Sequence, residues 1–138
     1  MTGTYRHTID QKGRLFIPAK LREELGESFY VTKEVDNCLV AYPKNVWKEI
    51  EEKMAALPRS KARNLQRMIF GSAERCELDS QGRILIPQAL REYAGLEKEV
   101  YTIGTGDRLE IWDKQEYINY CAAKYNPETL SKEFASLG

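Results

Sequence analysis

The chain has 138 residues, of which 42% are hydrophobic and 30% are charged, a composition typical of globular proteins and unlike that of disordered or fibrous ones. Its 21 basic side chains balance its 21 acidic ones, and its three cysteines are isolated from one another, which excludes a disulfide framework and a cysteine-rich zinc site. No apolar run is long enough to span a membrane and no signal-peptide pattern is present, so we expect a cytoplasmic protein without a membrane partner.

The first predicted feature along the chain is a turn at Asp10–Gly13. An Asp at the first position of a turn accepts hydrogen bonds from the backbone ahead of it, and a Gly at the fourth position tolerates a positive φ. Asp10 and Gly13 are therefore predicted to be structural turn residues, and the alternating apolar residues that follow favour a hairpin. Pro18 suits the first turn of a helix, and Gly26 suits its end. The other elements expected here are strands at 14–17, 29–32 and 38–42, a helix at 19–25, and an amphipathic helix at 44–57.

A connecting helix is expected at 60–70, where four apolar side chains share one helical stripe. The basic side chains of this segment occupy other positions. They are typical of a solvated helix face, and a contact with DNA or with another subunit is the alternative. The apolar residues are Ala62, Leu65, Met68 and Ile69, and the basic ones are Lys61, Arg63 and Arg67.

The second half of the chain repeats the first. Leu78–Glu92 aligns with Ile9–Glu23 at an offset of 69 residues, so Asp79 and Gly82 are predicted to form the same turn as Asp10 and Gly13. The further elements expected in this copy are strands at 83–86, 99–103 and 109–112, a helix at 88–94, and an amphipathic helix at 114–125. The sequence therefore predicts hairpin-helix-hairpin modules, each with its helix, at 1–58 and 71–125, a connecting helix at 59–70, and a tail at 126–138 that is either helical or disordered.

Charge is distributed unevenly between the two copies. Residues 1–69 carry 13 basic and 9 acidic side chains, a balance of +4, whereas residues 70–138 carry 8 and 12, a balance of −4. The neutral total therefore leaves room for a basic face on the first copy that contacts a polyanion, together with an acidic face that points elsewhere.

Catalytic patterns are absent from the sequence. His7 is the only histidine and cannot form a metal site alone, and no GxSxG motif or nucleotide-binding glycine loop occurs. We therefore expect a protein that is not an enzyme and that uses no metal, cofactor or small-molecule substrate.

The duplicated Asp-x-x-Gly-Arg motif, which continues through Ile-Pro to Leu-Arg in both copies, resembles the MraZ family of bacterial transcriptional regulators. The resemblance implies an α+β fold in which two SpoVT-AbrB-like modules interleave into one pseudo-symmetric swapped-hairpin β-barrel. Other segments that carry the resemblance are His7–Asp10, Asp36–Leu39, Tyr42–Pro43, Trp47, Glu77–Asp79, Glu92–Leu96 and Glu110–Trp112.

The same resemblance implies a function. Members of the MraZ family regulate the division and cell-wall gene cluster by binding repeated boxes in the promoter of their own operon. The resemblance therefore implies a nucleoid-associated repressor that binds double-stranded DNA. It also implies a ring-shaped homo-oligomer, an octamer or a dodecamer.

Arginines in the repeated motif are the candidate DNA-binding residues. Arg can donate two hydrogen bonds to guanine, and a two-stranded ribbon fits the major groove. We expect Arg14 to read bases, Lys12 and Arg6 to contact phosphates, and Arg83 to occupy the matching position of the second copy.

Several alternatives remain open from the sequence. Arg14 and Arg83 can instead be strand residues that pair with Asp10 and Asp79, and the protein can be an AbrB-like antitoxin or a ring-forming scaffold without specific DNA binding. Other conspicuous residues are expected to be structural. Arg22 and Arg91 are expected on a helix surface or in interface salt bridges, and Trp47, Trp112, Tyr42 and Tyr117 in the core or in a subunit interface.

Overall fold

The computed structural model describes residues 1–138 and contains eight strands and six helices. Each half of the chain follows the order strand, strand, helix, strand, strand, helix, helix. The strands are β1 (Thr4–Thr8), β2 (Arg14–Phe16), β3 (Ser28–Lys33), β4 (Leu39–Pro43), β5 (Glu74–Glu77), β6 (Arg83–Leu85), β7 (Glu99–Gly104) and β8 (Leu109–Asp113). The helices are α1 (Ala19–Leu25), α2 (Lys44–Ala56), α3 (Arg59–Ser72), α4 (Gln88–Ala94), α5 (Lys114–Lys124) and α6 (Pro127–Ala135).

Strand pairing exchanges the beginnings of the two repeats. β1 pairs with β7 of the second repeat, and β5 pairs with β3 of the first. The strands that follow the two turns, β2 and β6, pair with each other. The strands on either side of a turn therefore do not form the local hairpin that the alternating pattern predicted, because their partners lie in the other repeat. This exchange is the swapped-hairpin arrangement that the resemblance implied.

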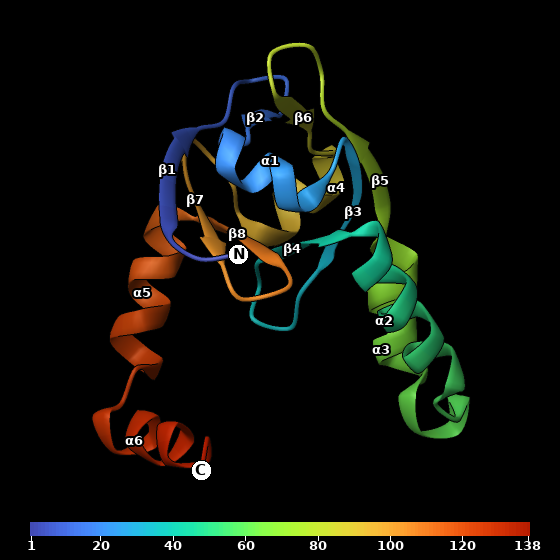
Figure 1. The fold of residues 1–138 in the computed structure, drawn as a ribbon, viewed down its shortest axis with the longest axis vertical. Coiled ribbons are helices and arrows are strands. Elements are labelled where there is room, and N and C mark those ends of the chain that lie inside the picture. Colours follow the sequence, from blue (N-terminus) through green and yellow to red (C-terminus); the bar gives the residue numbers. More distant parts are fainter.

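The strands form a six-stranded antiparallel sheet in the order β1-β7-β8-β4-β3-β5, and a two-stranded ribbon of β2 and β6. β1 and β5 are the edges of the sheet, and each continues through its turn into the ribbon (Figure 1). The curved sheet and the ribbon thus enclose a common interior, with the ribbon at one end of the molecule.

One hydrophobic core serves both repeats. Its 18 buried residues include Leu15 of the ribbon and Ile84, which faces Leu15 directly in the strand register. Leu21 of α1 and Leu90 of α4 bury their side chains in the same cluster. Full burial of a side chain of this size stabilises the fold by about 1.5–3 kcal/mol. Because each repeat contributes such side chains to the same cluster, neither repeat has a complete core without the other.

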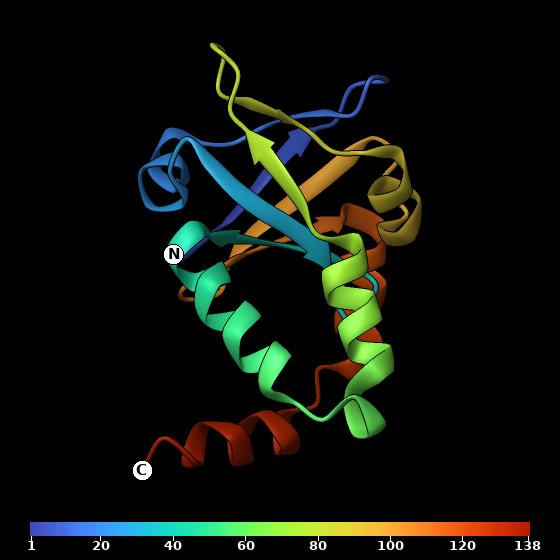
Figure 2. The same cartoon turned by 90° about the vertical axis from the view of Figure 1, so that its right-hand side faces the viewer.

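Two helical arms extend from the end of the sheet opposite the ribbon (Figures 1 and 2). In the first arm, α2 packs with α3 over a second apolar cluster that contains Val40, Tyr42, Trp47 and Ile69. Trp47 and Tyr42 are 6% and 4% exposed, and Trp112 is 3% exposed, which confirms the structural role predicted for these three aromatics. The ring of Tyr117 is half-buried and lies 5.2 Å from that of Trp112.

The second arm consists of α5 and α6. The tail, for which the sequence left helix and disorder open, forms α6 with Asn126 as its cap: the Asn126 side chain accepts hydrogen bonds from the backbone N–H groups of Glu128 and Thr129. No side chain of α6 is buried. None of the six helices combines the length and the apolar composition required to cross a lipid bilayer.

Candidate nucleic-acid interface

The two repeated turns project from the same end of the molecule, above the β2–β6 ribbon (Figure 2). In the first turn, Asp10 Oδ1 accepts hydrogen bonds from the backbone N–H groups of Lys12 and Arg14, at 3.0 and 2.9 Å. The N–H of Gly13 donates to the backbone oxygen of Asp10 at 3.0 Å, and Gly13 has a φ of +89°. The roles of Asp and Gly in this turn are those expected from their physical properties.

The second turn has the same geometry. Asp79 Oδ1 accepts hydrogen bonds from the backbone N–H groups of Gln81 and Arg83, at 2.8 and 2.9 Å, and Gly82 has a φ of +76°. One rigid turn is therefore present twice, with Lys12 in the first copy and Gln81 in the second.

Each turn aspartate also holds the arginine that follows it. Asp10 Oδ2 lies 2.6 Å from Arg14 Nε, and Asp79 Oδ2 lies 3.0 Å from Arg83 Nε. The backbone N–H of the arginine lowers the pKa of each aspartate most, and the guanidinium lowers it further. Both carboxylates are thus ionised at neutral pH and fix the Nε edge of the guanidinium. The Nη1 and Nη2 groups of Arg14 make no hydrogen bond within the chain, so they remain available as a pair of parallel donors.

The ribbon places the two arginines on one surface. Arg14 faces Leu85 and Phe16 faces Arg83 in the strand register. Because side chains alternate along a strand, these four point away from the core, while Leu15 and Ile84 point into it. Arg14 and Arg83 are diagonal neighbours on this outer face, with side chains 36% and 28% exposed. The surface formed by the ribbon and the two turns is called the ribbon face below.

The other candidate residues lie at different distances from this surface. Lys12 is exposed in the first turn and belongs to the ribbon face. Arg6 is exposed on β1, outside the ribbon. Lys114 and, to a smaller extent, Arg6 lower the pKa of Glu99 on the neighbouring strand β7. The structure therefore groups Lys12, Arg14 and Arg83 but places Arg6 on the side of the sheet.

Arg22 and Arg91 have a role that sequence reasoning missed. Neither forms an ion pair with a carboxylate of the chain. A Cβ atom on Gly82 would overlap Arg22 Nη1, and one on Gly13 would lie 2.6 Å from Arg91 Nε. Arg91 Nε donates to the backbone oxygen of Ile86 at 2.9 Å. Each helix arginine thus packs on the turn glycine of the other repeat. The signal in the sequence is the repeated pairing of Gly-Arg with a later Leu-Arg.

His7 borders the ribbon face through an aromatic contact. Its ring lies 5.3 Å from that of Phe16 in an edge-on arrangement, and the guanidinium of Arg22 lies over the same Phe16 ring, 5.4 Å from its centroid. This packing gives His7 a structural role at the edge of the ribbon face. The chain contains no group of three or more His, Cys, Asp or Glu residues arranged to hold a metal ion.

Comparison with known proteins identifies similar sequences over both repeats. A family model described as "MraZ protein, putative antitoxin-like" matches residues 1–68 and 69–136. The chain is 56% identical over 120 residues to the transcriptional regulator MraZ of Heliobacterium modesticaldum, which covers 86% of this chain and 84% of that protein. It is 54% identical over 121 residues to the protein of the same name from Carboxydothermus hydrogenoformans, covering 86% and 85%. With the Desulforamulus reducens protein of that name it shares 48% identity over 138 residues, covering 98% and 97%.

Proposed function

This chain belongs to the MraZ family of transcriptional regulators, and on that premise we propose that it binds specific DNA sequences through its ribbon face. The observation that carries the proposal is the state of Arg14. Its Nε is fixed by Asp10, its Nη groups have no partner within the chain, and it lies on an exposed two-stranded ribbon.

Base reading by Arg14 follows from this geometry. Two parallel N–H donors match the O6 and N7 acceptors of guanine in the major groove, and such a pair contributes about 1–3 kcal/mol of discrimination against a wrong base. An arginine that is already oriented by a carboxylate loses less side-chain entropy when it binds than a mobile one does. Arg83 has the same orientation in the second turn and supplies a second base contact.

Phosphate contacts complement the base contacts. Lys12 is exposed on the first turn beside Arg14 and neutralises phosphates of the duplex that Arg14 reads. Arg6 contacts the sugar-phosphate backbone of this duplex at the side of the ribbon face. Gln81 takes the place of Lys12 in the second turn, so the first turn makes the stronger phosphate contact. These contacts add affinity that falls as the salt concentration rises.

The expected targets are repeated boxes in the promoter of the protein's own division and cell-wall gene cluster, which it represses. This activity places the protein in the cytoplasm, associated with the nucleoid. One ribbon face offers few base contacts, so several copies that bind adjacent boxes gain affinity through effective concentration.

A self-associated ring of eight or twelve copies provides those adjacent ribbon faces. Exposed apolar side chains on the α5–α6 arm support such association. Tyr125, Leu130 and Phe134 are 53%, 44% and 76% exposed, and apolar rows of this kind are typical of interfaces between protein chains.

Fluorescence anisotropy with DNA from immediately upstream of the gene tests the proposal, with a scrambled duplex of equal length as the control. The proposal predicts tighter binding to the upstream DNA at every salt concentration, and weaker binding to both duplexes as salt increases. Equal affinity for the two duplexes would refute it and would favour a scaffold without specific DNA binding.

A further inference from the structure

Helix α3 carries a concentration of positive charge that the ribbon face does not use. Its 14 residues include four basic side chains and no acidic one. All four are exposed, and none forms an ion pair within the chain. The basic residues are Arg59, Lys61, Arg63 and Arg67.

Three of these side chains form a row along the helix. Arg59, Arg63 and Arg67 are spaced by four residues, which corresponds to about 6 Å of rise per step and places them as neighbours on one side of the helix. The only hydrogen bond of this row is from Arg67 Nη1 to Asn64 Oδ1, at 3.2 Å. The row, defined here as the α3 arginine row, therefore offers three guanidinium groups without a carboxylate partner.

The helix that carries the row is held firmly against α2. Gln66 is 6% exposed, and its Nε2 donates to the backbone oxygens of Met54 and Leu57, both at 3.0 Å. Ile69 is buried in the second apolar cluster, and Phe70 packs edge-on against Trp47 with ring centroids 6.4 Å apart. These contacts hold the backbone of α3 in place, so binding of a ligand to the α3 arginine row does not require the helix to become ordered.

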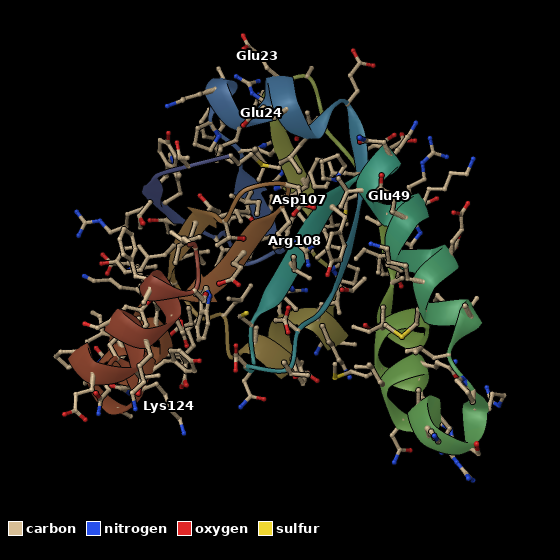
Figure 3. The ribbon with its side chains drawn as sticks, turned by 60° about the horizontal axis from the view of Figure 1, so that its bottom comes forward. Glu23, Glu24, Glu49, Asp107, Arg108 and Lys124 are labelled. Carbon is tan, nitrogen blue, oxygen red and sulfur yellow. The ribbon has the colours of Figure 1, made fainter.

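Negative charge on the same arm does not cancel the positive charge of α3. Helix α2 carries three lysines and three glutamates, so it adds no net charge to the four positive charges of α3. Glu49 is one of these glutamates and is visible on α2 in Figure 3. The arm formed by α2 and α3 thus has a net charge of +4, whereas the complete chain is neutral.

The row is remote from the ribbon face. β2 and β6 lie at one end of the long axis of the molecule, and the α2–α3 arm extends towards the other end (Figures 1 and 2). A straight duplex that lies across the ribbon face does not follow this arm. Phosphates bound at the row therefore belong to a different DNA segment.

We propose that the α3 arginine row is a second, sequence-independent DNA-binding surface that contacts phosphates of a second duplex. The protein then bridges two DNA segments. The ribbon face binds the bases of one segment, and α3 binds the phosphates of the other. The bridging role rests on the proposed function of the ribbon face, whereas phosphate binding at α3 does not. Each guanidinium that contacts a phosphate contributes to the salt dependence of binding, with a log–log slope of about 0.9 per contact.

The first experiment isolates the row in a protein whose ribbon face is disabled by Lys12→Ala, Arg14→Ala and Arg83→Ala. Anisotropy with a scrambled duplex measures its binding at low salt, with and without Arg63→Gln and Arg67→Gln. The matched control replaces two basic residues of α2 on the same arm, Lys48→Gln and Lys53→Gln.

The proposal predicts that the α3 substitutions weaken binding of the scrambled duplex by about fivefold or more and reduce the salt slope by about 2, while the α2 substitutions have a much smaller effect. Equal effects of the two pairs would overturn it, because they would indicate a dependence on overall charge. Unchanged affinity after the α3 substitutions would also overturn it, and would indicate that α3 contacts another protein.

The second experiment measures bridging with the otherwise unaltered protein. Beads that carry the upstream duplex are incubated with protein and with a labelled scrambled duplex, and the captured label is counted. The proposal predicts capture by the wild type and by the α2 variant, and loss of capture by the α3 variant, which still binds the upstream duplex and keeps its size in light scattering. Failure of the wild type to bind the upstream duplex specifically would refute the function of the ribbon face. Specific binding without capture would refute bridging alone.

Discussion

Arg91 of the second repeat packs directly on Gly13 of the first: a Cβ atom on Gly13 would lie 2.6 Å from Arg91 Nε and 2.8 Å from the backbone oxygen of Ile86. Arg22 has the reciprocal relationship with Gly82. In addition, the N–H of Ile86 donates to the backbone oxygen of Gly13, and that of Ile17 donates to Gly82, at 2.8 and 2.9 Å. The glycines that shape the turns therefore also join the two repeats, and the orientation of the ribbon face depends on this junction.

Replacement of Gly13 by alanine should destabilise the protein more than replacement of Gly106. Both glycines have a positive φ, +89° and +94°, and a side chain in that region costs about 1–2 kcal/mol. Gly106 has open space where its Cβ would be, whereas Gly13 does not, so Gly13→Ala must also displace Arg91 or the backbone of Ile86. Thermal unfolding of the two variants measures the difference. Equal losses in Tm would show that the contact between Arg91 and Gly13 adds nothing to stability.

Acid should weaken the turns. The folded state lowers the pKa of Asp79 below its ordinary value, so the contribution of the ionised carboxylate is complete above the ordinary pKa and is lost as the pH falls through the lower, folded value. The Tm difference between the wild type and Asp79→Asn should therefore be largest at neutral pH and should shrink below about pH 4. A difference that stays constant down to strongly acidic pH would contradict this assignment.

The three thiols should react at very different rates. Burial raises the pKa of Cys76 to about 11 and also raises that of Cys38, and both side chains are almost completely buried. Cys121 is half-buried on α5. Because the thiolate is the reactive form, a thiol-specific chromophore at neutral pH should modify Cys121 rapidly and the other two only when the protein unfolds. Simultaneous reaction of all three would show that the core opens readily.

Local elements of this fold were predictable from the sequence because local signals define them. Asp and Gly at fixed spacing define each turn, and a proline before a helix with a glycine after it gives the bounds of α1 and α4, which match those expected. The bounds of the other predicted strands and helices agree to within two residues. The turn roles of Asp10 and Asp79 follow from the same local chemistry.

The pairing of the strands was not predictable from local pattern. The alternation after Asp10 has the same form whether β2 pairs with β1 or with β6, because side-chain periodicity identifies a strand and not its partner. Only the resemblance to a family indicated the exchange. Likewise, the repeated Gly-Arg and Leu-Arg pairs mark Gly82 and Arg22 as related positions, but no local pattern shows that the two become neighbours, since they meet only after the repeats have interleaved.

The proposed function depends on arginines that are held by the turn aspartates and that read DNA. Arg108 is a suitable control because it is also held by an aspartate, with Nε 2.8 Å from Asp107 Oδ1, and its side chain is 31% exposed. It lies on the β7–β8 turn, which is at the opposite end of the sheet from the ribbon face (Figure 1).

The decisive measurement is therefore the affinity of Arg14→Ala and Arg108→Ala for the upstream duplex, determined by fluorescence anisotropy at one salt concentration. Light scattering and thermal unfolding first confirm that both variants are assembled and folded. Arg14→Ala should weaken binding to this duplex by about 5- to 150-fold, with a much smaller effect on a scrambled duplex, while Arg108→Ala should bind like the wild type. Wild-type affinity in a folded Arg14→Ala protein, or an equal loss in both variants, would show that Arg14 does not read bases.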